Sequence, residues 1–169
     1  MPDFDNTPYA YNSLIENADN KHVASSQNVY SNDLTGNIVY LNGTNLTINI
    51  NQALPGSNDP ALQNKPLYVV YANKDGMINL HVSADTVRPL VIYYLGATVN
   101  YNPSSSGIYR GVIYTPNAQL WVNENRADFR GSIYAKTFYS QVSGTYVYKA
   151  YSDNKSSGGS SIKLVDDDE

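Results

Sequence analysis

The stretch RGVIYTPNA at residues 110–118 is followed by the closely related stretch RGSIYAK at residues 130–136. Five segments share the centre of this phrase, and each ends in a tyrosine: NIVY, YVVY, LVIY, GVIY and GSIY. The five tyrosines are Tyr40, Tyr71, Tyr93, Tyr114 and Tyr134, and the last three of the four intervals between them are nearly equal. A period of roughly 20 residues is typical of solenoids, in which each repeat forms one coil. We therefore predict an all-β fold, a β-solenoid (β-helix) of about five coils.

Each tyrosine precedes a turn and a second run in which apolar and polar residues alternate. These runs are NLTINI at residues 45–50, MINLHV at 77–82, TVNY at 98–101, QLWV at 119–122 and, less regularly, AKTFYSQV at 135–142. Alternation with period two predicts strands with an inner and an outer face. The intervening Asn-Gly, Asp-Gly and Pro-Asn pairs supply or tolerate the positive φ that corners need. The first and longest interval contains NQALPGSNDPALQNKP at residues 51–66, which predicts an inserted loop.

The residue before each tyrosine predicts which side of the first strand is buried. All five are β-branched, which suits a packed, pleated surface, and we place them inside: Val39, Val70, Ile92, Ile113 and Ile133. One face of the second strand must also point inward, and its apolar residues are Leu46, Ile48, Ile78, Leu80, Val99, Leu120 and Val122. The five tyrosines then face outward on rungs about 4.8 Å apart. This Tyr ladder (Tyr40, Tyr71, Tyr93, Tyr114 and Tyr134) is the candidate binding surface.

The two ends of the chain differ from the repeats. The segment TPYAYNSLIENADNKHVASS at residues 7–26 predicts a helix that caps the solenoid or covers one flank, with Thr7 as N-cap and Pro8 at the first helical position. Its apolar face comprises Tyr11, Leu14, Ile15, Ala18 and His22. The C-terminal residues predict a flexible linker ending in an acidic run. The expected organisation is an N-terminal helix and cap over residues 1–30, a β-solenoid over 31–152 and a flexible acidic tail over 153–169.

Composition limits the function classes. The 169 residues carry a net charge of −4, and 15% are charged, which argues against a nucleic-acid partner because such proteins have a basic patch. The 16 tyrosines and abundant asparagines are typical of proteins outside the cell, and the absence of cysteine excludes disulfides and thiolate metal sites. No run approaches the roughly 20 apolar residues of a membrane span. No signal-peptide pattern begins the chain, which indicates either a cytosolic protein or, as we favour, part of a longer one.

Motifs for catalysis are missing from the sequence. It contains no glycine-rich phosphate loop, nucleophile elbow or HExxH motif, and its two histidines, His22 and His81, lack metal-site spacing. The one close group of charges, on a predicted corner, comprises Glu124, Arg126, Asp128 and Arg130. We interpret this group as solvated surface charge, in preference to a salt-bridged corner or a functional site. We therefore expect no enzyme, no metal and no cofactor.

The pattern GxIYxPNA…GxxxAK resembles the C-terminal domain of bacterial PilX-like or pilin-like surface proteins. Its residues here are Gly111, Ile113, Tyr114, Pro116, Asn117, Ala118, Gly131, Ile133, Ala135 and Lys136, and the similarity extends over residues 110–144. The resemblance implies a single-stranded, right-handed β-helix located outside the cell, in the envelope or on a pilus, and no particular reaction. Where family members often close with a His-Tyr-Asp segment, this chain has YVYKAY at residues 146–151.

We expect a non-enzymatic structural or adhesion module of the bacterial surface, with a protein, a glycan or a second copy of the chain as partner. Three alternatives stay open: a carbohydrate-binding module that uses the Tyr ladder, a bactofilin-like polymer of end-to-end solenoids, and an ice-binding solenoid. Ice binding needs a flat column of threonines, which Thr44, Thr47, Thr98 and Thr115 do not obviously form. The Tyr ladder has a purely structural interpretation as well, because cross-strand aromatic contacts stabilise a sheet.

Overall fold

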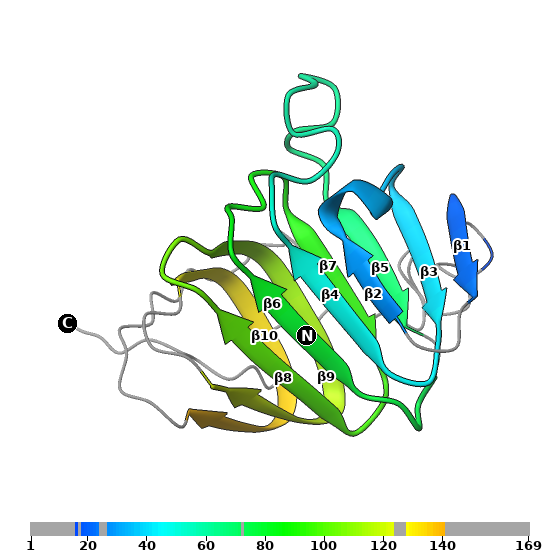
Figure 1. The fold of residues 1–169 in the computed structure, drawn as a ribbon, viewed down its shortest axis with the longest axis vertical. Helices are drawn as coiled ribbons and strands as arrows, with labels where there is room; N and C mark the ends of the chain where they lie inside the picture. The colour runs from blue at the N-terminus through cyan, green and yellow to red at the C-terminus, as the bar shows by residue number, and fades with distance from the viewer. Residues whose placement is uncertain (1–15, 17, 24–26, 72, 124–127, 141–169) are drawn as a thin grey trace, which may run out of the picture.

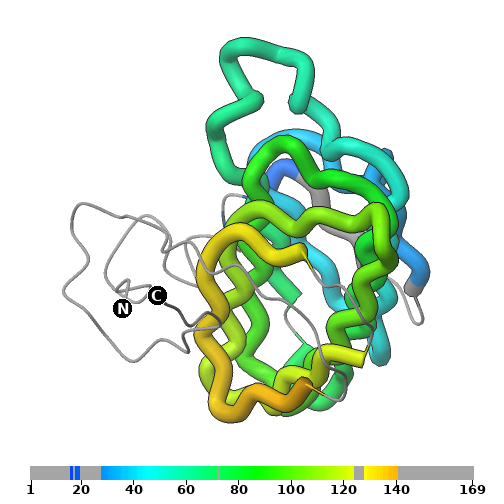
Figure 2. Tube along the Cα trace, turned by 90° about the vertical axis from the view of Figure 1, so that its left-hand side faces the viewer, coloured from blue at the N-terminus to red at the C-terminus, as the bar shows by residue number. Residues whose placement is uncertain are grey.

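The computed structural model describes residues 16, 18–23, 27–71, 73–123 and 128–140, which wind into a parallel β-solenoid of about five turns (Figures 1 and 2). The strands in the described residues are β1 (Asn20–Val23), β2 (Gln27–Tyr30), β3 (Ile38–Asn42), β4 (Leu46–Ile50), β5 (Leu67–Tyr71), β6 (Ile78–Val82), β7 (Leu90–Tyr94), β8 (Thr98–Pro103), β9 (Ile108–Val122) and β10 (Asp128–Ser140). A short 3-10 turn, η1 (Ser31–Asp33), follows β2. The prediction of an all-β solenoid is confirmed.

Each coil contributes to two walls. The first wall contains β1, β3, β5, β7 and the N-terminal part of β9, and the second contains β2, β4, β6, β8 and the C-terminal part of β9. Strand β10 pairs with β9 along both walls. All of these pairings are parallel, so each strand lies beside the equivalent strand of the next coil. In Figure 2 the coils lie one behind another, with β10 nearest the viewer.

The two copies of the repeated phrase are one full coil apart. Gly131 pairs with Gly111, Ile133 with Ile113 and Tyr134 with Tyr114. The glycines repeat because the rungs approach closely there: a Cβ on Gly131 would lie 1.7 Å from the carbonyl oxygen of Gly111. The loop predicted at residues 51–66 is also confirmed, and it projects from the solenoid between β4 and β5 (Figure 1).

The core lies between the two walls. On the second wall, the apolar residues that the sequence placed inward are all buried, at 0–1% exposure: Leu46, Ile48, Ile78, Leu80, Val99, Leu120 and Val122. On the first wall, the buried column comprises Val39, Val69, Ile92, Ile113 and Ile133, which the strand register makes direct neighbours. Burying each such side chain is worth about 1.5–3 kcal/mol.

At β5 the predicted register is wrong by one residue. Val69, not Val70, joins the buried column, and Val70 lies in the outer column between Tyr40 and Tyr93. Tyr71 therefore points into the core, where it is 1% exposed. Its ring stacks on that of Tyr94, and its hydroxyl donates to the carbonyl oxygen of Gly43 at 2.7 Å. The filled core position and the satisfied hydroxyl explain why this register is preferred.

The turn glycines have a different role from the one predicted. Among the described glycines, φ is positive at Gly36, Gly56 and Gly111, but not at Gly76 of the Asp-Gly turn or at Gly96. A Cβ on Gly76 would lie 2.0 Å from the Tyr71 hydroxyl oxygen, and one on Gly96 would lie 1.9 Å from that of Tyr94. These two glycines provide space for buried tyrosine hydroxyls.

The predicted N-terminal helix is not confirmed, and at residues 18–23 it is wrong. Residues Asn20–Val23 form β1, which pairs with β3 and places His22 beside Leu41. Backbone pairing with an available sheet edge outweighs the weak stability of a short helix. Strand β1 thus lies inside the segment predicted as a cap over residues 1–30. The rest of the helix prediction, at residues 7–15, 17 and 24–26, and the acidic tail over 153–169 lie outside the described residues.

Candidate binding face

The outer surface of the second wall carries two columns of polar and aromatic side chains. The alternation that buries Ile78, Leu80 and their equivalents turns the intervening residues outward. The strand register aligns Thr47, Asn79, Asn100, Trp121 and Tyr139 in one column. Asn49, His81 and Asn102 align in the second, which Asn123 extends. We call these nine residues the amide face.

Hydrogen bonds and ring stacking order this surface. The Nδ2 atom of Asn100 donates to Oδ1 of Asn79 at 3.1 Å, and Nδ2 of Asn123 donates to Oδ1 of Asn102 at 2.9 Å. The rings of Trp121 and Tyr139 stack with centroids 4.4 Å apart and planes 19° apart. The neighbouring coils therefore hold these side chains in fixed rows, which lowers the entropy lost when a ligand binds.

A shallow hollow of about 460 Å³ lies in the amide face, lined by Asn79, His81, Asn102, Pro103 and Ser104. The Oδ1 atoms of Asn79 and Asn102 accept the bonds from the next coil. Among the described residues no acceptor pairs with the Nδ2 atoms of these two asparagines, so the hollow presents N–H donors. None of the nine residues is Asp, Glu, Lys or Arg, and the face carries no formal charge while His81 is neutral.

The Tyr ladder is not an open platform. Tyr40, Tyr93, Tyr114 and Tyr134 do lie in one outer column of the first wall, as predicted, but Tyr71 is in the core. Tyr93 and Tyr114 are 2% and 8% exposed and stack with centroids 5.0 Å apart. They belong to a second apolar cluster, which comprises Val70, Val91, Tyr93, Val112 and Tyr114. Burial favours the structural interpretation of these tyrosines over the binding one.

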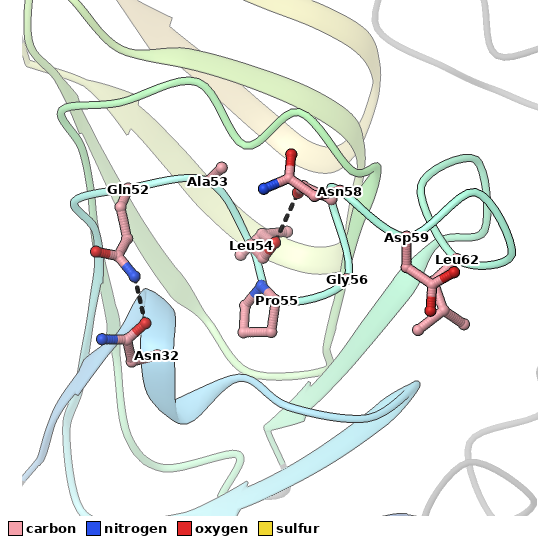
Figure 3. A pocket seen from close by; sticks show the side chains of 10 residues that line it. Asn32, Gln52, Ala53, Leu54, Pro55, Gly56, Asn58, Asp59 and Leu62 are labelled. Carbon is pink, nitrogen blue, oxygen red and sulfur yellow. Dashed lines mark hydrogen bonds between the residues drawn. The ribbon is translucent and has the colours of Figure 1, made fainter.

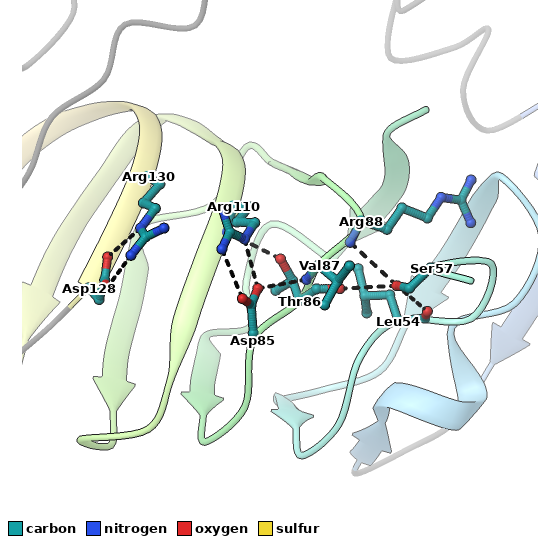
Figure 4. A network of polar contacts seen from close by, with 9 residues as sticks. All are labelled: Leu54, Ser57, Asp85, Thr86, Val87, Arg88, Arg110, Asp128 and Arg130. Carbon is teal, nitrogen blue, oxygen red and sulfur yellow. Dashed lines mark hydrogen bonds and ion pairs between the residues drawn. The ribbon is translucent and has the colours of Figure 1, made fainter. Parts of the chain in front are cut away.

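The predicted charged corner contains paired surface charges (Figure 4). Arg130 Nε lies 3.0 Å from Asp128 Oδ1, whereas Glu124 and Arg126 lie outside the described residues. One coil earlier, both carboxylate oxygens of Asp85 accept hydrogen bonds from Arg110 at 2.8 and 2.9 Å. This guanidinium lowers the pKa of Asp85, and the hydrogen-bonded Asp85 carboxylate in turn raises the pKa of Arg110. Both pairs are partly exposed, which agrees with the salt-bridged interpretation of the corner.

The inserted loop is attached to the solenoid by Arg88, a buried cation that sequence reasoning missed. Its guanidinium is 0% exposed, and burial lowers its pKa. Nε donates to the carbonyl oxygen of Lys65 at 2.8 Å, and Nη1 donates to those of Gly36 and Pro55 at 2.9 and 3.0 Å. Nη2 donates to Oδ1 of Asn37 at 2.8 Å. No carboxylate in the described part of the chain pairs with Arg88, so four oxygen acceptors stabilise its charge.

Ser57 provides a second attachment for the loop. Its hydroxyl donates to the carbonyl oxygens of Leu54 and Thr86 at 2.6 and 3.3 Å (Figure 4). A hollow of about 640 Å³ opens beside the loop, lined by ten residues that include Asn32, Gln52 and Asp59 (Figure 3). Gln52 donates to Asn32 at one side of this hollow, while Asp59 points away from them on the other. The polar groups diverge, so they do not form a single binding constellation.

Other site types find no support in the described residues. No group of three or more His, Asp or Glu side chains in this part of the chain is placed to hold a metal ion. No helix in it has the length and hydropathy required to cross a membrane. The threonines form no column either: Thr47 lies between Asn28 and Asn79, Thr98 lies beside Gln119, and Thr115 is buried.

Comparisons of the chain with protein-family models, with curated proteins and with solved structures found no match. The resemblance to pilin-like surface proteins therefore stays a prediction, together with the location that it implies. The amide face was not predicted as a site, although the sequence contains a pattern that indicates it. Asn79, Asn100 and Trp121 occupy the same position in successive alternating runs, one residue after an inward apolar residue.

Proposed function

We propose that this chain is a non-enzymatic adhesion module of the bacterial surface, located outside the cell or in the envelope and possessing a preformed binding surface, the amide face. The observation that carries the proposal is the stacked pair Trp121–Tyr139 in the same column as the bonded pair Asn79–Asn100. A flat surface on a rigid scaffold, with aromatic residues beside adaptable polar ones, has the composition of evolved binding sites such as antibody paratopes.

The physical argument rests on the low cost of binding to this surface. Four of the five asparagines of this face are ordered by bonds between coils and Trp121 is packed against Tyr139, so few rotamers are lost on association. Tyr and Trp combine a broad apolar ring with a polar atom. A pilus-associated or envelope position would present such a face to other cells or surfaces. A right-handed winding belongs to the same proposal, because parallel crossovers are right-handed in nearly all proteins.

The experiment is a binding screen of the purified chain against a panel of glycans and extracellular proteins. Trp121→Ala removes the larger ring, and Asn100→Asp places a charge in the centre of the amide face. Asn64→Asp, at an exposed position of the inserted loop, makes the same charge change elsewhere and is the matched control. We expect the wild type and Asn64→Asp to bind at least one panel member and the two face variants to lose that binding. Binding that is equal in all four proteins, or absent in all, contradicts the proposal.

A further inference from the structure

We infer that the ligand of the amide face is a neutral, extended polysaccharide whose chain lies along the solenoid axis, a conclusion that rests on the proposed adhesive function. The juxtaposition that carries it is the uncharged hollow at Asn79, His81 and Asn102 beside the stacked rings of Trp121 and Tyr139.

Charge selects the class of ligand. The nine residues of the amide face include no Asp, Glu, Lys or Arg, and the whole chain has a net charge of −4. An anionic polymer would lose hydration on this surface without meeting a fixed cation, and a cationic one would meet no carboxylate. A neutral ligand avoids both costs.

Hydrogen-bonding capacity narrows the class further. The amides of Asn79 and Asn102 use their carbonyl oxygens within the face and leave their N–H donors at the hollow. Ser104 at its edge adds a hydroxyl, which both donates and accepts. Sugar hydroxyls also donate and accept hydrogen bonds, so they match this combination of N–H donors and a hydroxyl closely. A protein partner is less well matched, since interface cores are usually apolar and this face has one aromatic pair.

The repeat of the solenoid matches an extended ligand. Neighbouring rungs are about 4.8 Å apart, so a linear polymer along the axis meets Asn79, Asn100, Trp121 and Tyr139 in succession. The two columns are two residues apart on each strand, about 7 Å, so a polysaccharide between them has contacts on both sides. The ring edges of Trp121 and Tyr139 provide apolar contact for the C–H groups of a sugar.

Affinity electrophoresis of the native chain tests this inference. Gels contain dextran or a soluble β-glucan as neutral probes, polygalacturonate as the anionic probe, or no polymer as reference. We expect retardation by at least one neutral polymer and none by polygalacturonate. Trp121→Ala and Asn100→Asp should each weaken retardation about tenfold, and Asn64→Asp should leave it unchanged. Added salt should not weaken neutral binding, because no ion pair contributes to it.

The outcomes separate this inference from the proposed function. Retardation by polygalacturonate as strong as by the neutral polymers overturns the neutral class, as does retardation that the two face variants leave unchanged. Face-dependent binding to a protein of the panel, with no retardation in any gel, overturns the polysaccharide and leaves the adhesive function standing. No face-dependent binding in either experiment overturns both. Near-ultraviolet circular dichroism of each variant verifies that it is folded.

Discussion

Tyr71 lies directly beside Tyr94 in the core, with ring centroids 5.2 Å apart and planes at 21°. The Tyr71 hydroxyl donates to the carbonyl oxygen of Gly43, and the Tyr94 hydroxyl donates to that of Gly76. Each tyrosine thus links its own coil to a neighbouring turn. This relationship fixes the register of β5 and explains why two turns of the solenoid require glycine.

Alkaline pH should destabilise the protein through these tyrosines. Burial, followed by the charge of Tyr94, raises the pKa of Tyr71 from 10.0 to about 12. Because the folded value lies above the unfolded one, the contribution of Tyr71 is fully present below pH 10 and is lost as the pH rises towards 12. Urea unfolding across this range should show falling stability, and Tyr71→Phe should make the fall shallower. An unchanged slope in Tyr71→Phe would contradict the assignment.

Gly96→Ala should destabilise the fold because of one neighbour. A Cβ at Gly96 would lie 1.9 Å from the hydroxyl oxygen of Tyr94 and 2.4 Å from a ring carbon, so the ring must shift, at a cost of about 1–3 kcal/mol. In a Tyr94→Leu background, which is itself less stable, the same substitution should cost much less. Denaturant titration of the four proteins measures the coupling, and additive effects would contradict the steric explanation.

Arg88→Met should release the inserted loop. The change leaves the carbonyl oxygens of Gly36, Pro55 and Lys65 without their donor, so we expect a loss of about 3 kcal/mol or more. Limited proteolysis should cleave within residues 51–66 faster than in the wild type. Lys65→Ala is the control, because the exposed side chain is removed while its backbone carbonyl stays. Equal cleavage rates in the wild type and Arg88→Met would refute the role of Arg88.

Asp85→Asn should reduce stability at neutral pH but not under strongly acidic conditions. The Arg110 guanidinium holds the pKa of Asp85 below 3.8, so the pair stabilises the fold above that pH and loses its effect as the pH falls through the lowered value. With the two side chains 31% and 35% exposed, the contribution is at most about 1 kcal/mol. The difference in unfolding free energy between wild type and variant should shrink under acidic conditions. A difference that persists there would assign the effect to another contact of Asp85, such as its bond to the Val87 amide.

Val87→Asn should stabilise the protein. Val87 is β-branched, has a φ of 60° and is 44% exposed, so its side chain adds strain without filling the core. Asparagine tolerates this backbone region, and the gain should be about 1 kcal/mol. Thermal unfolding measures it, with Val87→Ala as a control that keeps most of the strain. A melting temperature for Val87→Asn at or below that of Val87→Ala would argue against strain at this position.

The candidate site was harder to predict than the fold. The sequence placed Tyr40, Tyr93, Tyr114 and Tyr134 correctly in an outer column, but exposure depends on what packs over a column, and local alternation does not encode that. Trp121 and Tyr139 belong to successive coils and become neighbours only because β10 pairs with β9 across a register shift. Arg88 was missed because three of its four acceptors are backbone carbonyls distant in the sequence, which carry no residue signature.

The amino-acid sequence by itself determined the class of fold. A regular repeat length and strict alternation are local, one-dimensional patterns, and they suffice to predict coils, strands and a buried second-wall face. Tertiary structure alone decided the register of β5, the burial of Tyr93 and Tyr114 and the strand at Asn20–Val23. The reason is energetic: in the segment YVVY, either of the two alternating sets of side chains could face the core with similar local strand propensity. Only the stacking of Tyr71 on Tyr94 and the hydrogen bond from the Tyr71 hydroxyl to Gly43 favour the observed register.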